Sequence, residues 1–296
     1  MDLLSLRCFQ AVARHEHISR AAAELRVAQP SVSRTIARLE AELGVRLFDR
    51  HGRRVRLNQY GTAFLRRVDR ALGELDDARR ELADAVGPDH GTIALASETL
   101  LSLTGLLSEY RNRYPDVRVR LFQSTAELMS RQLRSREVDF CLASQPLTGS
   151  SLDSVELLRE EVLLVVPRGH PLAGRERVAI RELADEPFVS TRAGHWQRAL
   201  LDRLFAAEGL VPTIVCEGDE PGAAPALVGA GLGIGLVPAM SRGAFGHVPV
   251  AILRIDAPRC DRTLSLVWRH DTYLCTAARK FRALAVERKA RPPTEP

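Results

Sequence analysis

The sequence contains no apolar run long enough to cross a membrane. A membrane-spanning helix needs about eighteen or more consecutive apolar residues, and every hydrophobic stretch here is interrupted before that length. Residues 1–7 also lack the basic segment followed by an apolar run that marks a secretory signal. These absences argue against a membrane or secreted protein and predict one that stays in the cytoplasm.

Cysteine is scarce, and no cysteine pair has the spacing of a metal site or a disulfide framework. The five cysteines are Cys8, Cys141, Cys216, Cys260 and Cys275. Their number is odd, none form a Cys-x-x-Cys pair, and no histidine stands at metal-ligand spacing. The sequence therefore predicts no structural disulfide, no metal and no other cofactor. A thiol redox switch at Cys216 is the alternative to ordinary buried thiols, although nothing near it would activate it.

Acidic residues are in the minority only at the beginning of the chain. Residues 1–60 hold eleven arginines and six acidic residues, whereas residues 61–296 hold 31 basic and 31 acidic residues. A positive excess confined to one end predicts an acidic partner there, and nucleic acid fits a cytoplasmic protein best. The alternative is a basic face that is merely solvated.

The same sixty residues have the pattern of a small helical module. Apolar residues at helical spacing predict a helix over 3–14, and Ser19 is expected to cap a short alanine-rich helix over 20–25. A turn at 26–28 then leads to a third helix, which has Pro30 in its first turn and is ended by Gly44.

The third helix has one apolar face and one face of polar, partly basic residues. The apolar face carries Val32, Ile36, Leu39 and Leu43, and the opposite face carries Gln29, Ser33, Arg34 and Arg38. Glutamine and arginine make paired hydrogen bonds to adenine and guanine edges, so this face is typical of a recognition helix. An ordinary polar surface helix is the alternative.

A β-hairpin wing is predicted directly after this helix. Apolar residues at 45–48 suit a strand, His51-Gly52-Arg53-Arg54 suits a basic turn, and residues 55–57 alternate like a return strand. Arginines at such a tip suit contact with the DNA backbone or minor groove.

Taken together, these residues resemble the LysR-type family of bacterial regulators. The resemblance is carried by Phe9-x-Ala-Val-Ala, by Ser19-x-Ala-Ala-x-x-Leu25, and by the run from Gln29-Pro30-Ser-Val-Ser33-Arg34 to Leu47-Phe48-x-Arg50. It implies a winged helix-turn-helix, a long linker helix used for dimerisation, and a two-lobed effector domain similar to periplasmic binding proteins. One departure is Asn58, where the family more often has threonine, but asparagine caps a helix equally well.

Carried over position by position, the resemblance implies that one face of the third helix reads DNA. Gln29, Ser33 and Arg34 are expected in the major groove, and Arg53 or Arg54 in the minor groove. The full set of expected DNA contacts is Gln29, Pro30, Ser31, Ser33, Arg34, Arg38, Arg53 and Arg54. The expected partner is double-stranded DNA with a pseudo-palindromic operator.

Residues 58–86 contain no proline and have apolar residues three or four positions apart. They predict one helix of about 43 Å at about 1.5 Å per residue, too long to be covered by the sixty-residue head alone. Its stripe is expected to pack on a second copy in a homodimer or homotetramer, and packing within one chain is the alternative. The predicted dimer contacts are Phe64, Val68, Leu72, Leu75 and Leu82.

Strand and helix patterns alternate in the rest of the chain, which predicts an α/β fold. The expected architecture is therefore α/β with an N-terminal all-α winged helix-turn-helix, a long linker helix and a two-lobed periplasmic-binding-protein-like effector domain. The expected divisions are 1–58, 59–90 with the hinge, 91–290 and a tail at 291–296. Lobe 1 would cover about 91–164 and 267–290 and lobe 2 about 165–266, with crossovers near Val165 and Leu266.

Hydroxyl side chains follow three predicted strands, where α/β folds bind ligands. With two neighbours, the predicted effector contacts are Ser97, Thr99, Ser124, Thr125, Ser190, Thr191, His195 and Trp196. The expected effector is a small organic acid or amino acid. For each hydroxyl taken alone, a helix cap or turn is an equally good interpretation.

No catalytic set stands out, so the sequence predicts no enzyme. Gly231, Gly233 and Gly235 follow a predicted helix and precede a strand, the reverse of a nucleotide-binding order, and suit a tight turn. A non-specific architectural DNA binder is a second rival, but it would not need a charge-balanced back domain. We therefore predict a sequence-specific transcription regulator modulated by an effector between the lobes, with RNA polymerase as a further partner.

Overall fold

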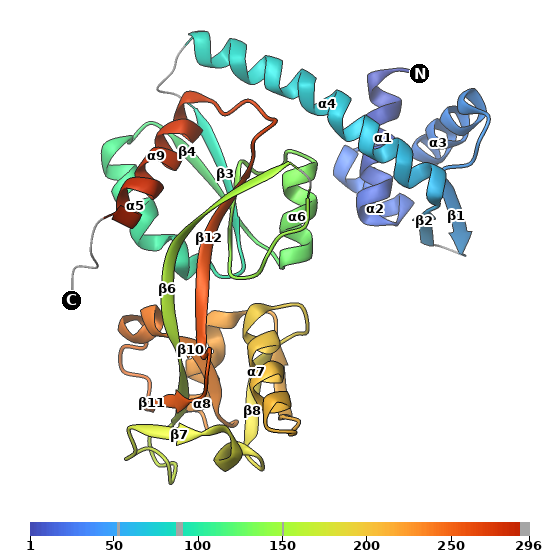
Figure 1. Ribbon diagram of the computed structural model, residues 1–296. Helices are drawn as coiled ribbons and strands as arrows, with labels where there is room; N and C mark the ends of the chain where they lie inside the picture. Colours follow the sequence, from blue (N-terminus) through green and yellow to red (C-terminus); the bar gives the residue numbers. More distant parts are fainter. Residues whose placement is uncertain (52–53, 87–90, 150, 291–296) are drawn as a thin grey trace. The chain divides into compact units, whose positions relative to one another are not determined.

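A computed structural model of the protein describes residues 1–51, 54–86, 91–149 and 151–290. The chain divides into two compact units, Met1–Val86 and Gly87–Pro296 (Figure 1). Within the described ranges, no helix is both long and apolar enough to cross a membrane. The same ranges contain no cluster of histidine, cysteine or acidic residues suited to a metal ion.

The first unit is a three-helix module with a hairpin and a long final helix, as the sequence predicts. Its elements are α1 (Leu3–His15), α2 (Ile18–Leu25), α3 (Gln29–Leu43), β1 (Phe48–His51), β2 (Arg54–Leu57) and α4 (Gln59–Val86). One expectation was wrong: the N-cap of α2 is His17 rather than Ser19. His17 has extended backbone angles and its carbonyl accepts from the Ala21 amide, so Ser19 is already helical.

An aromatic cluster holds the first unit together. Phe9 of α1 is fully buried between Phe48 of β1 and Phe64 of α4, with ring centroids 5.4 and 5.2 Å away. The Glu40 carboxylate on α3 accepts from the amides of Leu47 and Phe48 at 2.7 and 3.2 Å, which fastens the hairpin to α3. The module therefore holds α3 and the hairpin in a defined arrangement.

Asn58 caps the long helix α4, as predicted. Its Oδ1 accepts from the Gly61 amide at 2.9 Å, and its Nδ2 donates to the Arg46 carbonyl at 2.9 Å. Gly61 is required by close packing, because a Cβ there would lie 2.0 Å from the Leu47 carbonyl oxygen. The start of α4 is thus tied to the base of the hairpin.

The second unit alternates strands and helices in two lobes, as expected. Its first elements are β3 (Thr92–Ser97), η1 (Leu100–Leu103), α5 (Thr104–Arg113), β4 (Arg118–Gln123), α6 (Ala126–Arg134), β5 (Phe140–Ala143) and β6 (Leu152–Pro167). The middle elements are β7 (Arg177–Ala179), η2 (Ile180–Leu183), β8 (Pro187–Thr191), α7 (Trp196–Ala207), β9 (Thr213–Gly218), η3 (Pro221–Ala223) and α8 (Ala224–Gly229). The last are β10 (Gly235–Pro238), η4 (Ala239–Ala244), β11 (Val250–Asp256), β12 (Asp261–Arg269) and α9 (Thr276–Ala290).

Two long antiparallel strands, β6 and β12, run from one lobe into the other (Figure 1). The sheet order is β4-β3-β5-β12-β6-β11-β7, with β10 also paired to β6. The first lobe is built on β3, β4, β5 and β12, and the second on the end of β6 with β10 and β11, beside the separate pair β8-β9. Each lobe has its own apolar core.

The crossovers lie a few residues earlier in both strands than the sequence suggested. Val165 already pairs with Gly235 and Ile252 inside the second lobe, whereas Leu266 pairs with Leu142 inside the first. The change of partner falls near Glu160 on β6 and Asp261 on β12. The apolar run of β6, at 162–166, lies in the second lobe, and the apolar run of β12, at 264–268, lies in the first, so each run marks a lobe rather than the crossing point.

The glycine run at 231–235 forms the predicted tight turn from helix to strand. Gly231 and Gly233 have φ values of 85° and 149°, and a Cβ on Gly233 would lie 2.3 Å from the Pro187 carbonyl oxygen. The run connects α8 to β10 and packs against the start of β8, where a nucleotide-binding loop would instead open a helix.

Candidate DNA-binding and effector-binding sites

The predicted recognition face of α3 is exposed at the beginning of that helix. Gln29, Pro30 and Arg34 are exposed, and Ser31 and Ser33 are half-buried. The Gln29 amide donates to the Ser33 hydroxyl at 3.2 Å, and the Arg34 Nε makes only a long 3.4 Å contact with the Pro30 carbonyl. Among the described residues, no carboxylate neutralises Arg34.

Arg38 is held differently from the other residues of this face. Its Nη2 lies 3.4 Å from an oxygen of Asp2 and 3.4 Å from the Ser5 hydroxyl, at the beginning of α1. Hydrogen bonds from Ser5 are the main reason why the pKa of Asp2 lies below its usual value, so Asp2 is an anion near this arginine. Arg38 thus has an internal ionic contact, which the sequence did not indicate.

The hairpin after α3 has the register expected of a wing. Phe48 pairs with Leu57 and His51 pairs with Arg54, so the two strands are antiparallel and in register from one end to the other. Arg53 lies outside the described residues, and only the backbone of Arg54 is described. Arg56 was not singled out from the sequence; its Nε lies 3.9 Å from Glu16.

The apolar stripe of α4 has two different environments. Val68 and Leu72 are buried in the core of the first unit, and Phe64 packs against that core. Leu75 and Leu82 are exposed, at 44% and 70%. Val68 and Leu72 therefore have no exposed apolar surface with which to contact a second copy. The stripe is not one continuous dimer surface, and of its residues Leu75 and Leu82 are exposed enough to contact a second copy.

The hydroxyls at the first two strand ends are engaged within the first lobe. The Ser97 hydroxyl contacts the carbonyls of Thr99 and Leu142 at 3.0 and 3.2 Å. The Ser124 hydroxyl donates to Gln132 Oε1 at 2.8 Å, and Thr125 caps α6. Thr99 is half-buried at the start of η1. These contacts match the capping interpretation that the sequence left open.

The third strand end lies at a small apolar cavity in the second lobe. Ser190, Thr191 and Gln197 line this cavity, whose volume of about 20 Å³ is near that of one water molecule. The Thr191 hydroxyl and Gln197 Oε1 are buried without a hydrogen-bond partner among the described residues. His195 caps the beginning of α7 by its backbone, and its Nδ1 is also buried without such a partner.

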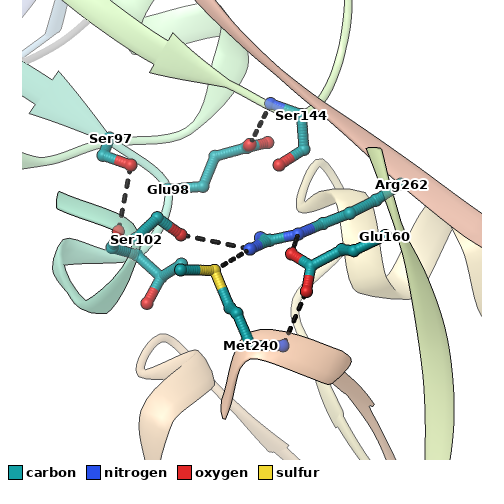
Figure 2. A network of polar contacts seen from close by, with 8 residues as sticks. Ser97, Glu98, Ser102, Ser144, Glu160, Met240 and Arg262 are labelled. Carbon is teal, nitrogen blue, oxygen red and sulfur yellow. Dashed lines mark hydrogen bonds and ion pairs between the residues drawn. The ribbon is translucent and has the colours of Figure 1, made fainter. Parts of the chain in front are cut away.

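A buried ion pair joins the two crossover strands between the lobes (Figure 2). Arg262 Nε on β12 donates to Glu160 Oε1 on β6 at 2.7 Å, and the two side chains are 2% and 7% exposed. Glu160 Oε2 accepts from the Met240 amide at 2.6 Å, and Arg262 Nη2 reaches the Ser102 hydroxyl at 3.2 Å and Met240 Sδ at 2.9 Å. Ser102 belongs to the first lobe and Met240 to the second, so this network connects both lobes.

A second polar cluster lies beside this network. Glu98 is buried and accepts from the Ser144 amide at 2.8 Å (Figure 2). It also accepts from Gln145 Nε2 at 3.1 Å. Gln145 Nε2 also donates to the Gly194 carbonyl of the second lobe at 3.1 Å. Sequence reasoning missed these groups, because their partners lie between 22 and 160 residues away along the chain and no local pattern links them.

Four of the five cysteines are buried, as the sequence suggested, and no disulfide joins any of the five, all of which the structure describes. Cys216, for which a redox role was the alternative, is half-buried. Burial raises the pKa of Cys8 and of Cys141, and raises that of Cys260 to about 11. A thiol with a raised pKa stays protonated near neutral pH and is a poor nucleophile.

A helix-turn-helix with a hairpin wing, followed by a two-lobed α/β unit with a polar network between its lobes, defines a ligand-responsive transcription regulator. Residues 3–62 match the model of the bacterial regulatory helix-turn-helix protein, lysR family, and residues 87–290 match the LysR substrate binding domain. The protein therefore belongs to the LysR family: it is a DNA-binding transcription regulator with an effector-binding domain.

Similar proteins are transcription regulators rather than enzymes. The uncharacterized HTH-type transcriptional regulator YybE of Bacillus subtilis is 34% identical over 97% of this chain and 98% of its own. The transcriptional dual regulator GltC of the same organism is 31% identical over 97% of both chains. The crystal structure of full-length CbnR with its target DNA is 25% identical, with a TM-score of 0.58, over 98% of this chain and all of its own.

Proposed function

We propose that the protein regulates transcription in the cytoplasm by reading a pseudo-palindromic operator as a homodimer or homotetramer, under control of a small organic acid or amino acid. The observation that carries the DNA-reading part is the exposed start of α3. There an unneutralised arginine and a glutamine stand beside the positive end of the helix dipole. The solved DNA complex of the similar protein CbnR supports the same assignment.

Within this face, Gln29, Ser33 and Arg34 are the proposed base-reading residues. Pro30 and Ser31 would lie beside the DNA backbone, and the wing arginines Arg53 and Arg54 would contact phosphates or the minor groove. Arg38 is a weaker candidate than the sequence suggested, because it shares its charge with Asp2.

The test is competition between operator and random DNA at matched salt. A defined operator should compete far better than random duplex, and equal competition would favour a non-specific architectural protein. Arg34→Ala should cost about 1–3 kcal/mol on the operator and flatten discrimination among operator variants. Arg54→Ala should weaken binding to all duplexes and lower the salt slope by about one. Arg181→Ala, an exposed position in the second unit, is the matched control.

The exposed half of the α4 stripe is the proposed dimer contact. Leu75 and Leu82 are separated by one heptad, and the exposed Ala71 and Ala78 complete a three-and-four spacing. Leu75→Glu with Leu82→Glu should convert the dimer to monomers in sedimentation velocity, while Arg79→Glu on the same helix should not. A double variant that remains dimeric would contradict the assignment.

Buried polar atoms without protein partners, most of them in the second lobe, support an effector site in this unit. Such atoms, within the described chain, include Ser144 Oγ, Thr191 Oγ1, His195 Nδ1, Trp196 Nε1, Gln197 Oε1 and Arg262 Nη1. A buried polar atom without a hydrogen bond costs about 1–3 kcal/mol, and a polar ligand would remove that cost. Three of the eight residues predicted from sequence have such an unpartnered atom: Thr191, His195 and Trp196. Three others, Ser97, Ser124 and Thr125, already have hydrogen-bond partners. Thr99 and Ser190 have no buried unpartnered side-chain atom.

Calorimetry with a panel of organic acids, amino acids and neutral compounds tests the effector class. Binding of a neutral or bulky compound, with no binding of any acid or amino acid, would overturn it. An effector that binds one lobe arrangement better would shift the population of that arrangement. We propose that this change alters the spacing of the paired DNA-binding units, and hence contact with RNA polymerase.

A further inference from the structure

A groove of about 580 Å³ lies between the two lobes, beside the start of β12. One wall is a single face of α7, formed by Trp196, Ala199, Leu200 and Arg203, which follow the three-and-four spacing of one helix face. The groove is also lined by Ser144 and Gln145, which follow β5, and by the start of β12. Its volume lies in the range of small-molecule sites, about 300–1,000 Å³.

The groove is strongly basic. Four arginines line it, Arg159, Arg203, Arg259 and Arg262, against one carboxylate, Asp261. Asp261 already pairs with Arg159 at 2.7 Å. Arg203 donates to the Arg259 carbonyl at 2.8 Å, and neither Arg203 nor Arg259 has a carboxylate partner in the described part of the chain. Two positive charges at one end of the groove are therefore uncompensated.

The groove also has buried donors without partners. Arg262 is 3% and Trp196 4% exposed, and Arg262 Nη1 and Trp196 Nε1 have no hydrogen-bond partner among the described residues. Both groups can only donate, and the Ser144 hydroxyl, which also lines the groove, is likewise buried without a hydrogen-bond partner among the described residues. A ligand with acceptor atoms would give these donors their missing hydrogen bonds, and a negatively charged ligand would neutralise the positive charges.

We propose that this groove binds a small molecule with two acidic groups. One acidic group would accept from Arg262 Nη1 and Trp196 Nε1, and the other would lie at Arg203 and Arg259. The proposal rests on the proposed effector function and narrows its ligand from organic acids and amino acids in general to dianions. It also assigns the ligand to residues of which only Trp196 was predicted from the sequence.

The position of Arg262 explains how such a ligand would act on the lobes. Its guanidinium lies 4.8 Å from the centre of the Trp196 ring in the second lobe and contacts Ser102 in the first. Glu160 neutralises it from the other crossover strand. An acidic group on Nη1 would compete with Glu160 for the same cation, and Glu160 also accepts from the Met240 amide of the second lobe. Ligand binding is thereby linked to the contacts that join the lobes.

Tryptophan fluorescence of the full chain tests this proposal directly. The protein has two tryptophans, and Trp268→Phe leaves Trp196 in the groove as the only reporter. The probes are succinate, butyrate and succinamide, which share a carbon skeleton and have two, one and no acidic groups. Malonate, glutarate and phosphoglycolate extend the dianion arm to other lengths and to phosphate esters. We expect dianions to change the Trp196 emission at concentrations where butyrate and succinamide do not.

Variants distinguish the groove from any other site. In the Trp268→Phe background, Arg203→Ala with Arg259→Ala should weaken dianion binding by about tenfold or more, the usual effect of losing a charged hydrogen bond. Arg168→Ala, an exposed arginine of the same lobe outside the groove, should leave binding unchanged. Both arginines of the double variant are exposed, so its fold should be intact by circular dichroism.

The results distinguish binding of dianions in this groove from binding of an acidic effector at another site. Dianion binding that the double variant abolishes supports the groove. Dianion binding that the double variant leaves unchanged overturns the groove and keeps an acidic effector elsewhere between the lobes. If no dianion of any length binds, the proposal is overturned, and calorimetry with monoacids, amino acids and neutral compounds then decides separately whether the proposed function stands.

Discussion

The two units of this protein use arginine in opposite ways. In the first unit Arg34 is exposed on α3, four residues from Pro30 and without a carboxylate partner among the described residues. In the second unit Arg262 is buried, paired with Glu160 and in contact with side chains from both lobes. The first arrangement suits a large external anion such as DNA, and the second suits a small ligand and a change of shape.

This difference follows from how each site is assembled. The proposed DNA-reading face lies on the first turns of one helix, so residues near in sequence are near in space. The inter-lobe network combines residues from η1, β6, η4 and β12. A local site tolerates changes elsewhere in its unit as long as the helix stays in place. A site assembled from distant segments depends on the packing of both lobes.

Phe9→Ala should have the largest effect, and only in the first unit. It removes a fully buried ring from between Phe48 and Phe64, which costs about 4 kcal/mol. We expect loss of operator binding in gel shifts, while the unfolding transition seen by tryptophan fluorescence stays unchanged, because both tryptophans lie in the second unit. Leu4→Ala, at a 66% exposed position of the same helix, should be nearly silent. A shifted tryptophan transition would show that the units do not fold independently.

Glu160→Gln should destabilise the second unit by about 3 kcal/mol, since it leaves the Arg262 cation buried without its counter-ion. The measurement is urea unfolding followed by tryptophan fluorescence, with Glu156→Gln at an exposed position of the same strand as the control. Glu160→Met combined with Arg262→Leu should recover much of the loss, because apolar groups can replace both partners of a buried pair. Equal destabilisation by the single and double variants would contradict the pairing argument.

Asn58→Ala should have the smallest effect, about 1 kcal/mol, by removing the cap of α4. Circular dichroism of the first unit's thermal transition would measure it. Asn58→Thr should retain most of the stability, because a threonine hydroxyl also accepts from the helix amides. If threonine costs as much as alanine, the Asn58 Nδ2 contact with the Arg46 carbonyl matters more than the cap.

The sequence predicted the local features of the first unit well, but it did not predict the polar contacts between the two lobes of the second. Periodicity gave α1, α3 and α4 nearly to the residue, and cap chemistry identified Asn58. The same reasoning misplaced the cap of α2, because His17 holds that position by its backbone alone. The hydroxyl residues do lie at strand ends as predicted, yet the hydroxyls of Ser97 and Ser124 donate hydrogen bonds to groups of their own lobe.

The amino-acid order by itself determined the family, the helix-turn-helix, the α/β class of the second unit and the exposed polar face of α3 on which the proposed DNA contacts lie. Each of these depends on residues within a few turns or strands of one another, where spacing translates directly into geometry. Only the tertiary structure decided which half of α4 is free, where the strands cross between lobes, and that Arg262, Trp196 and Ser144 line one groove. Those outcomes depend on contacts between distant segments, and burial and charge at such contacts are set by packing rather than by spacing.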